Sequence, residues 1–480
     1  MAYNNQNNTL KTGRTFINKL KGFFSNVVES VSGTEQDFTE GKLSRAILLL
    51  SIPAVLEMIM ESVFVVVDIY FVSRLGADAV ATVGITESMI TIVYAISIGL
   101  ATATTSMVSR RMGEKNPLAA SRVAFQAILT GILVALLIGI PGALNSGKLL
   151  GLMGASESIV TKMSGYTTVM LAGNIVIMLL FIINAIFRSA GDAAIAMRVL
   201  WVGNIINIIL DPCLIFGLGP FPHLGVTGAA VATTTGRGIA VLYQFYLLFF
   251  GKKRIQLSFS QLGIDFKIIG KIFKLSFGSI GQNLIGTTSW IALVRIISVF
   301  GSEVVAGYTI AIRIISFILL PSWGISNAAA TLVGQNLGAK KPDRAERAVI
   351  ITGLANMVLL GSIGTVLVII PTPFIGLFVH EPEVLKAGVE CLRIVSIGFI
   401  AYGLGMVLVN SFNGAGDTST PLKINIFAFW FIEIPLAWLL ALKWGMNEEG
   451  VFVAIVIAES IMTFTAWIVF RRGKWKLKEV

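Results

Sequence analysis

Apolar residues of this chain gather in runs long enough to cross a membrane, and short polar connections separate the runs. A helix needs about 20 predominantly apolar residues to span the hydrocarbon core of a bilayer. Unpaired backbone groups cannot face lipid, so we expect helices rather than a barrel. We therefore predict an all-α integral membrane protein with twelve transmembrane helices, at approximately 44–73, 79–107, 119–144, 158–187, 196–217, 225–250, 267–300, 303–333, 347–372, 384–412, 421–442 and 450–470.

The composition agrees with this pattern, because 55% of the 480 residues are hydrophobic and only 13% are charged. A soluble chain carries roughly twice that charged fraction. The composition therefore excludes a disordered chain, a disulfide scaffold and a cytosolic enzyme. Cys213 and Cys391 both lie in apolar runs, so we expect them to be buried free thiols.

The basic residues predict the orientation of the chain. Of the 37 lysines and arginines, 28 lie in the N-terminus, the even-numbered connections and the C-terminus, and five lie on the opposite side. Cytoplasmic connections carry an excess of basic residues. We therefore expect a multi-pass protein of the cell membrane with both termini in the cytoplasm. Orientation accounts for the net charge of +11, so the charge calls for no nucleic-acid partner.

The chain repeats itself once. The segment GLATATTSMVSRRMGEKNP at 99–117 matches GISNAAATLVGQNLGAKKP at 324–342, a shift of 225 residues. FRSAGD at 187–192 and FNGAGD at 412–417 show the same shift. Each copy holds six spans, an even number, so both copies enter the membrane from the same side. Two pseudo-symmetric six-helix bundles are then related by an axis along the membrane normal.

This repeat predicts the domain organisation and favours a transporter, because transporters place their substrate between two such halves. A channel is more often built from several small subunits around one axis. We expect the following order: a cytoplasmic tail at 1–43 with an amphipathic surface helix within it, an N-terminal lobe at 44–250, a linker at 251–266, a C-terminal lobe at 267–470 and a basic tail at 471–480.

Several motifs resemble those of the multidrug and toxic compound extrusion (MATE) transporters. They are VVVDIYFVSRLG at 65–76, GNIINIILDPCLIFG at 203–217 and LGVTGAAVAT at 224–233, and the resemblance covers about residues 38–472. It implies a monomeric efflux antiporter, not an enzyme, that rocks its two lobes. It would export cationic or amphipathic organic compounds in exchange for protons or sodium ions, and it needs no cofactor beyond that ion.

The first span carries three acidic residues, Glu57, Glu61 and Asp68. Their spacing places them within roughly 40° of one helix face. An acid inside a membrane is costly and is a functional hypothesis by default. We expect this face to look at a cavity, where Glu57 and Glu61 line the lumen and attract cations. Gln282 and Asn283 of the seventh span are further cavity candidates.

Asp211 of the fifth span lies toward the outer end, as Asp68 does in the first span. Two carboxylates in a poorly solvated pocket cannot both easily ionise. Such a pair can accept and release a proton, or it can hold a sodium ion together with Asn207. No other metal site is expected. Pro53 precedes Asp68 by 15 residues and removes a helical hydrogen bond, so we expect the first helix to bend there.

In the MATE branch that this chain resembles, ions are coupled through a polar network of the N-terminal lobe. Carried over position by position, that network falls on Asp68, Tyr166, Asn184, Asn207, Asp211 and Thr233. Another branch relies on acids of the seventh and tenth spans. The seventh span has none here, which favours coupling in the N-terminal lobe.

Two alternatives remain open from the sequence. A flippase for a lipid-linked saccharide would favour a basic cavity, and four arginines lie within spans: Arg237, Arg295, Arg313 and Arg393. Glu87, Glu433 and Glu459 could instead pair with these arginines. A membrane-embedded enzyme is the weaker alternative, because the chain has no His-Glu-x-x-His, Gly-x-Ser-x-Gly or Walker motif.

Overall fold

The computed structural model describes residues 25, 27–33, 36–251, 254–258 and 263–480, and these residues form helices and connections without a strand. The first half contains α2 (Leu43–Ser73), α3 (Ala77–Gly113), α4 (Pro117–Leu144), α5 (Ser146–Leu152), α6 (Glu157–Ala172), α7 (Asn174–Ala190), α8 (Ala193–Phe216) and α9 (Val226–Phe250). The second half contains α10 (Phe266–Ile297), η2 (Ser298–Phe300), α11 (Ser302–Gly338), α12 (Pro342–Ile369), α13 (Thr372–Gly376), α14 (Pro382–Ile397), α15 (Phe399–Ala415), α16 (Ser419–Asn425), η3 (Ile426–Glu433), α17 (Ile434–Trp438), η4 (Leu439–Lys443), α18 (Asn447–Arg471) and η5 (Lys474–Leu477).

These elements form the twelve predicted membrane helices. Ten helical stretches of the described residues are long and apolar enough to cross a membrane on their own. The tenth predicted span is a broken helix, in which α14 and α15 meet at 58°. The sixth predicted span is the 25-residue helix α9, which does not reach the same hydropathy. The predicted fold class is therefore confirmed.

The internal repeat recurs in the bounds of the helices. The helices α3 and α11 begin and end 225 residues apart, and so do α4 and α12. Pro117 and Pro342 each begin their helix, where a missing N–H costs no hydrogen bond. Gly191 and Gly416 end equivalent helices with φ of 98° and 86°, a conformation that favours glycine. The same local chemistry therefore shapes both halves.

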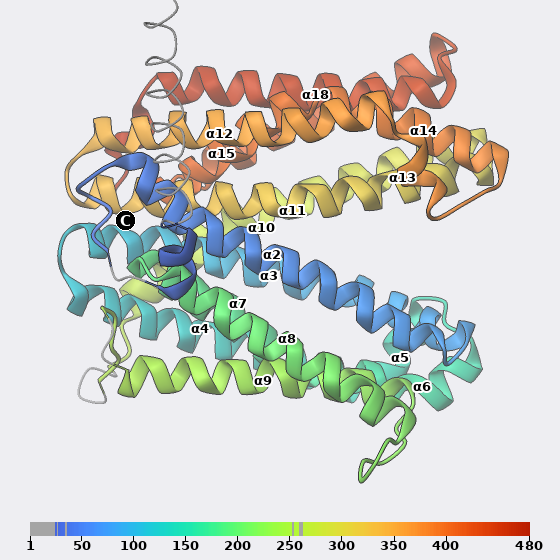
Figure 1. Cartoon of the computed structure of the whole chain (residues 1–480), viewed down its shortest axis with the longest axis horizontal. Coiled ribbons are helices and arrows are strands. Elements are labelled where there is room, and N and C mark those ends of the chain that lie inside the picture. The colour runs from blue at the N-terminus through green and yellow to red at the C-terminus, as the bar shows by residue number, and fades with distance from the viewer. Residues whose placement is uncertain (1–24, 26, 34–35, 252–253, 259–262) are drawn as a thin grey trace, which may run out of the picture.

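The two lobes meet near one end of the molecule and diverge toward the other. Helices of the two halves lie close together at the end that carries the C-terminus, and they spread apart toward α5, α6, α13 and α14 (Figure 1). A Cβ atom on Gly113 would lie 1.9 Å from the carbonyl oxygen of Gln335, and one on Gly338 would lie 2.1 Å from that of Arg110. The backbones of α3 and α11 thus touch at the closed end, and only glycine fits at both positions.

The segment after α18 joins the two lobes at this closed end. Trp475 stacks on Phe470, with ring centroids 4.9 Å apart. Arg110 of α3 donates a hydrogen bond to the carbonyl oxygen of Lys478 at 2.8 Å. The Lys478 ammonium lies 3.2 Å from the Asp417 carboxylate in the C-terminal lobe. We call residues 473–480 the C-terminal latch, because they contact both lobes.

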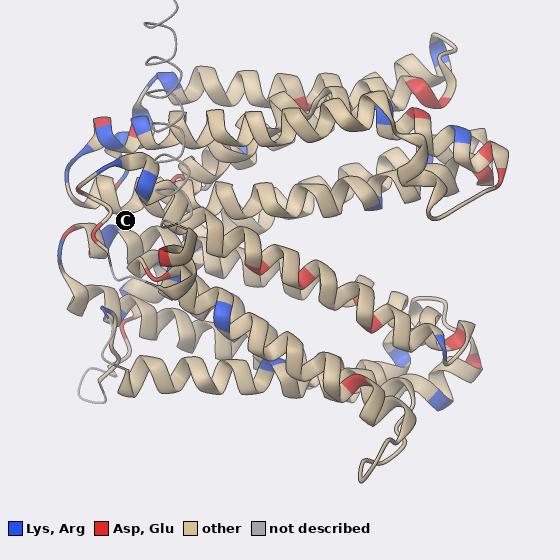
Figure 2. Cartoon of the chain, viewed as in Figure 1, with Lys and Arg blue, Asp and Glu red and all other residues tan. Residues whose placement is uncertain are grey.

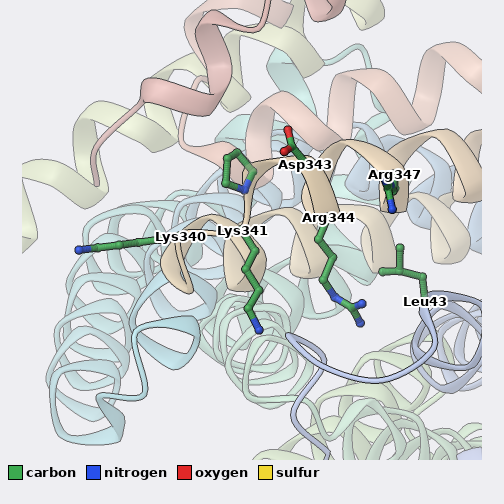
Figure 3. Close-up of a pocket in the computed structure, with 7 residues that line it drawn as sticks. Leu43, Lys340, Lys341, Asp343, Arg344 and Arg347 are labelled. Atoms are coloured by element: carbon green, nitrogen blue, oxygen red, sulfur yellow. The ribbon is translucent and has the colours of Figure 1, made fainter.

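Many lysine and arginine residues lie at the closed end (Figure 2). A basic pocket of about 380 Å³ lies there, and Lys340, Lys341, Arg344 and Arg347 contribute to its lining. Two of its side chains, Lys341 and Arg344, extend toward the segment that precedes α2 (Figure 3). They donate hydrogen bonds to the carbonyl oxygens of Thr39 at 3.0 Å and Gly41 at 2.9 Å.

The amphipathic helix predicted in the N-terminal tail covers residues 14–31. Residues 14–24 and 26 lie outside the described residues, and residues 27–32 are helical.

Candidate functional site

Buried polar side chains of the N-terminal lobe form three groups along α2. The face that carries Glu57, Glu61 and Asp68 turns toward α7, α8 and α9 of the same lobe, where the residues described below contact it. The predicted alignment of the three acids is therefore correct. Each acid has a different environment, and that difference decides its chemistry.

The first group surrounds Glu57, which is 3% exposed. Arg188, in the last turn of α7, donates to both of its carboxylate oxygens at 2.9 Å. Asn184 donates to Glu57 at 3.0 Å and accepts a hydrogen bond from Gln244 at 2.6 Å. The prediction that Glu57 lines the lumen as a free negative charge is wrong, because a long guanidinium side chain reaches back from the helix end and neutralises it.

The second group surrounds Arg237 of α9, whose side chain is 5% exposed. Its guanidinium donates to Glu61 at 2.6 Å and to the Tyr94 hydroxyl at 3.1 Å, and it lies 5.0 Å from the centre of the Phe64 ring. Asn204 donates to the second oxygen of Glu61 at 3.2 Å. Glu61 is therefore neutralised as well, and because its side chain keeps 27% exposure, its predicted place on the lumen stays a prediction.

The third group contains Asp68 and Asp211, which are 9% and 0% exposed. Asn207 donates to Asp211 at 3.3 Å and to Thr233 at 3.1 Å. The charges of the two aspartates are close enough to act on each other. Among the described residues, no lysine or arginine forms an ion pair with either carboxylate. Of the three groups along α2, this is the one whose acids form no ion pair, and the charge of Arg237 acts on Asp68 from beyond ion-pair distance.

The third group also offers buried oxygen atoms for a cation. One oxygen each of Asp68, Asp211 and Asn207 is buried without a hydrogen-bond partner. Oxygen ligands of this kind suit a proton or a hard cation such as sodium. The described residues contain no cluster of three or more histidine, cysteine, aspartate or glutamate side chains suited to a metal ion. The donor set therefore fits a monovalent ion held by two carboxylates and an amide.

Five of the six network residues carried over from the MATE resemblance lie together. Tyr166 of α6 is 3% exposed and close enough to Asp68 and Asp211 for their charges to act on it. Asn184 is the exception, because its amide is bound to Glu57 in the first group.

The two candidates on α10 belong to the C-terminal lobe. Gln282 is 7% exposed. It donates to Asn413 at 3.0 Å and to the carbonyl oxygen of Thr418 at 2.9 Å, so it joins neighbouring segments of this lobe, and its predicted place in the cavity stays a prediction. Asn283 is half-buried and donates to its own helix, at Ser279. Pro53 lies within α2, which is one 31-residue helix, and the predicted bend stays a prediction.

Sequence reasoning missed Arg188, Tyr94 and Asn204. Arg188 was placed in a cytoplasmic connection, and nothing in its spacing links it to Glu57. The available signal was the number of acids and arginines in the lobe, because a buried carboxylate is rarely stable without a partner and so predicts a nearby arginine.

A two-lobed bundle of twelve membrane helices with buried acids is an architecture typical of membrane transporters. The MatE family model matches residues 53–213 and again residues 278–439. The chain therefore belongs to the MatE family and is a transporter, not an enzyme.

Relatives of known name match over nearly the whole chain. A probable multidrug resistance protein NorM of Thermotoga maritima is 24% identical over 92% of this chain and 94% of its own length. An FAD transporter of Shewanella oneidensis is 26% identical over 90% and 95%. The multidrug export protein MepA of Staphylococcus aureus is 22% identical over 90% and 94%.

Solved structures share the fold. The chain resembles a MOP superfamily transporter from Pyrococcus furiosus with a TM-score of 0.86 at 24% identity, over 92% of this chain and 98% of the other. The same score, identity and coverage hold for a multidrug resistance MATE family transporter in an outward-facing conformation.

Proposed function

We propose that this protein is a secondary active antiporter that exports cationic or amphipathic organic compounds in exchange for protons or sodium ions. One observation carries the proposal: Asp68 and Asp211 are buried within range of each other's charge and form no ion pair, whereas Glu57 and Glu61 of the same lobe are paired with arginines. Buried like charges of this kind favour the uptake of a positive ion. The names of the multidrug relatives support the substrate class.

The orientation follows from the distribution of basic residues. Lysines and arginines gather at the closed end, which we assign to the cytoplasm together with both termini. The described conformation then opens away from the cytoplasm, like the outward-facing structure it resembles. In this state an external ion has access to Asp68, which retains 9% exposure.

Ion binding would change the charge of the third group and so change its packing. A proton on Asp211 turns an acceptor into a donor, and the buried oxygen of Asn207 is then a partner for it. A sodium ion would draw the same three oxygens together. Either event alters how α2 packs against α8, and α2 also contacts the C-terminal lobe, where Gly324 lies against the backbone of Ala54. The lobes would then rock about this contact.

Two other substrate classes receive less support. One relative is named an FAD transporter, and a flippase would also carry an anionic group. An anion requires uncompensated basic side chains. Arg237 is the one of the four intramembrane arginines that is buried, and it is paired with Glu61.

The test is ethidium transport, measured as accumulation inside inverted vesicles and proteoliposomes, under an imposed proton gradient and then under a sodium gradient. We expect Asp68→Asn and Asp211→Asn each to lower ion-driven efflux by about tenfold or more, since each removes a charge that the ion must neutralise. The folded protein should survive, because a neutral amide is cheaper to hold in a membrane than a carboxylate.

The matched control is Asp78→Asn, which makes the same chemical change at an exposed position in the first turn of α3. It should transport like the parent. Undiminished efflux by both Asp68→Asn and Asp211→Asn would refute coupling through this group. Efflux under only one of the two gradients identifies the ion.

A further inference from the structure

The C-terminal lobe contains a cavity of about 310 Å³ between α10, α11, α14, α15, η3 and α18. Two acids line it, Glu433 of η3 and Glu459 of α18. They are 5% and 9% exposed, so both are taken almost completely out of contact with solvent. Neither belongs to the network of the N-terminal lobe.

The two carboxylates differ in their hydrogen-bond partners. Glu433 accepts a hydrogen bond from Ser289 at 2.5 Å. One oxygen of Glu459 is buried without a hydrogen-bond partner. Both carboxylates line the same cavity, and the charge of Glu433 acts on Glu459. A buried acid whose oxygen has no donor is costly unless a positive ligand or a proton supplies what the protein does not.

The surrounding elements provide no compensating charge. Neither glutamate forms an ion pair within the part of the chain that the structure describes. Arg295 of α10 and Arg313 of α11 are exposed. The remaining ionisable groups near the cavity are the neutral side chains of Tyr308 on α11, Cys391 on α14 and Tyr402 on α15.

The internal repeat does not account for these acids. The positions 225 residues earlier hold Ile208 and Thr234. Glu433 ends a π-helical stretch of eight residues, and π-helical turns are frequent at functional sites. The second lobe has therefore acquired a polar centre that the first lobe lacks at the equivalent positions.

The walls of the cavity indicate its ligand. Trp290, Phe399, Tyr402 and Phe429 supply aromatic rings. Aromatic faces attract organic cations. Pockets for small organic ligands begin at about 300 Å³, far more than a sodium ion needs. Acids surrounded by rings in a cavity of this size suit a compact organic cation and exclude large dyes.

We propose that this cavity is a second cation site, which binds a compact ammonium compound between Glu459, Glu433 and the surrounding rings. The entering cation replaces one proton that the two carboxylates hold, so one positive charge leaves as one enters. This proposal takes one element from the proposed function, namely that the ligand is an organic cation. It does not depend on ion coupling in the N-terminal lobe.

Binding of radiolabelled tetraethylammonium to the protein in lipid nanodiscs, without any gradient, tests this site. Gly286 lines the cavity, and a Cβ atom added there meets nothing within 4 Å. Gly286→Leu should therefore fill the cavity without a clash and weaken binding by about tenfold or more. Gly286→Ala is the matched control and should bind nearly as the parent does.

Two further variants separate this site from the coupling group. Glu459→Gln should also lose binding, because the amide cannot neutralise the cation. The double variant Asp68→Asn/Asp211→Asn should keep it, whatever its transport activity. Unchanged binding by both Gly286→Leu and Glu459→Gln would overturn the proposal, and so would loss of binding in the double variant alone.

Proton release provides a second readout. In weakly buffered solution, saturation with tetraethylammonium should release about one proton for each cation bound, because one positive charge replaces another. Binding with no release would overturn the exchange. A release that survives Glu459→Gln would place the proton elsewhere and overturn it equally.

Discussion

The ion pair of Glu61 and Arg237 connects the first and last helices of the N-terminal lobe. Removal of Glu61 should destabilise the lobe more than removal of Arg237. Glu61→Gln leaves a guanidinium that is 5% exposed and keeps the Tyr94 hydroxyl and the Phe64 ring as neighbours, with the charge of Asp68 acting on it from beyond ion-pair distance. Breaking a buried pair from one side costs about 3–5 kcal/mol. The side chain of Glu61 is itself 27% exposed, so we expect the lower end, about 3 kcal/mol.

The opposite change should cost less. Arg237→Met keeps most of the volume and leaves Glu61 with the amide of Asn204 and partial access to solvent. The lost charged hydrogen bond is worth about 2 kcal/mol. In the double variant no buried charge remains, so its cost should be about 2 kcal/mol, well below the combined cost of the single changes.

The assay is equilibrium unfolding in mixed micelles, followed by tryptophan fluorescence, for the parent, both single variants and the double variant. Glu157→Gln, an exposed acid at the start of α6, is the control and should stay within about 0.5 kcal/mol of the parent. Additive single costs, or a cost below about 1 kcal/mol for Glu61→Gln, would show that the pair does not hold the lobe together.

Two other predictions concern the closed end. Deleting residues 474–480 removes the latch contacts to Arg110 and Asp417 and should let the closed end open more often. A cysteine introduced at the buried position Ser106 should then react with a maleimide several-fold faster, and an unchanged rate would show that the latch does not hold the closed end together. Gly113→Leu should sharply reduce the yield of folded protein in gel filtration, because its Cβ would lie 1.9 Å from the Gln335 carbonyl oxygen. Gly84→Leu is the control and should keep the yield of the parent, because a Cβ atom there meets nothing within 4 Å. Equal yields for the two variants would contradict the close contact of α3 and α11.

Local patterns were sufficient to predict the fold. Most of the membrane helices are continuous apolar runs. The repeat depends on turns such as Gly191 and Gly416, whose positive φ favours glycine. The face of α2 that carries Glu57, Glu61 and Asp68 follows from helical periodicity. The grouping of Asp211, Asn207 and Thr233 came from the MATE resemblance, and the structure brings these three together.

Pairing between distant helices was not predictable in the same way. An arginine side chain is long enough to pair with an acid at a membrane depth well away from its own backbone, as Arg188 does with Glu57. Arg237 had several acids as candidate partners, and only the packing of α9 against α2 selects Glu61. The cavity beside Glu459 is built by six separate elements, so no single stretch of sequence contains its pattern.

The modest hydropathy of α9 has a consequence for the synthesis of the protein. Arg237 and Gln244 make this helix a poor candidate to enter a bilayer alone. Its backbone lies against α8 where Gly203 and Gly236 meet, so the two helices can leave the translocon as one hairpin. Glu61 emerges from the ribosome 176 residues before its partner Arg237. The N-terminal lobe therefore cannot fold to completion one helix at a time. Glu61 of α2 stays in the membrane without its ion-pair partner until the sixth helix, α9, has been inserted.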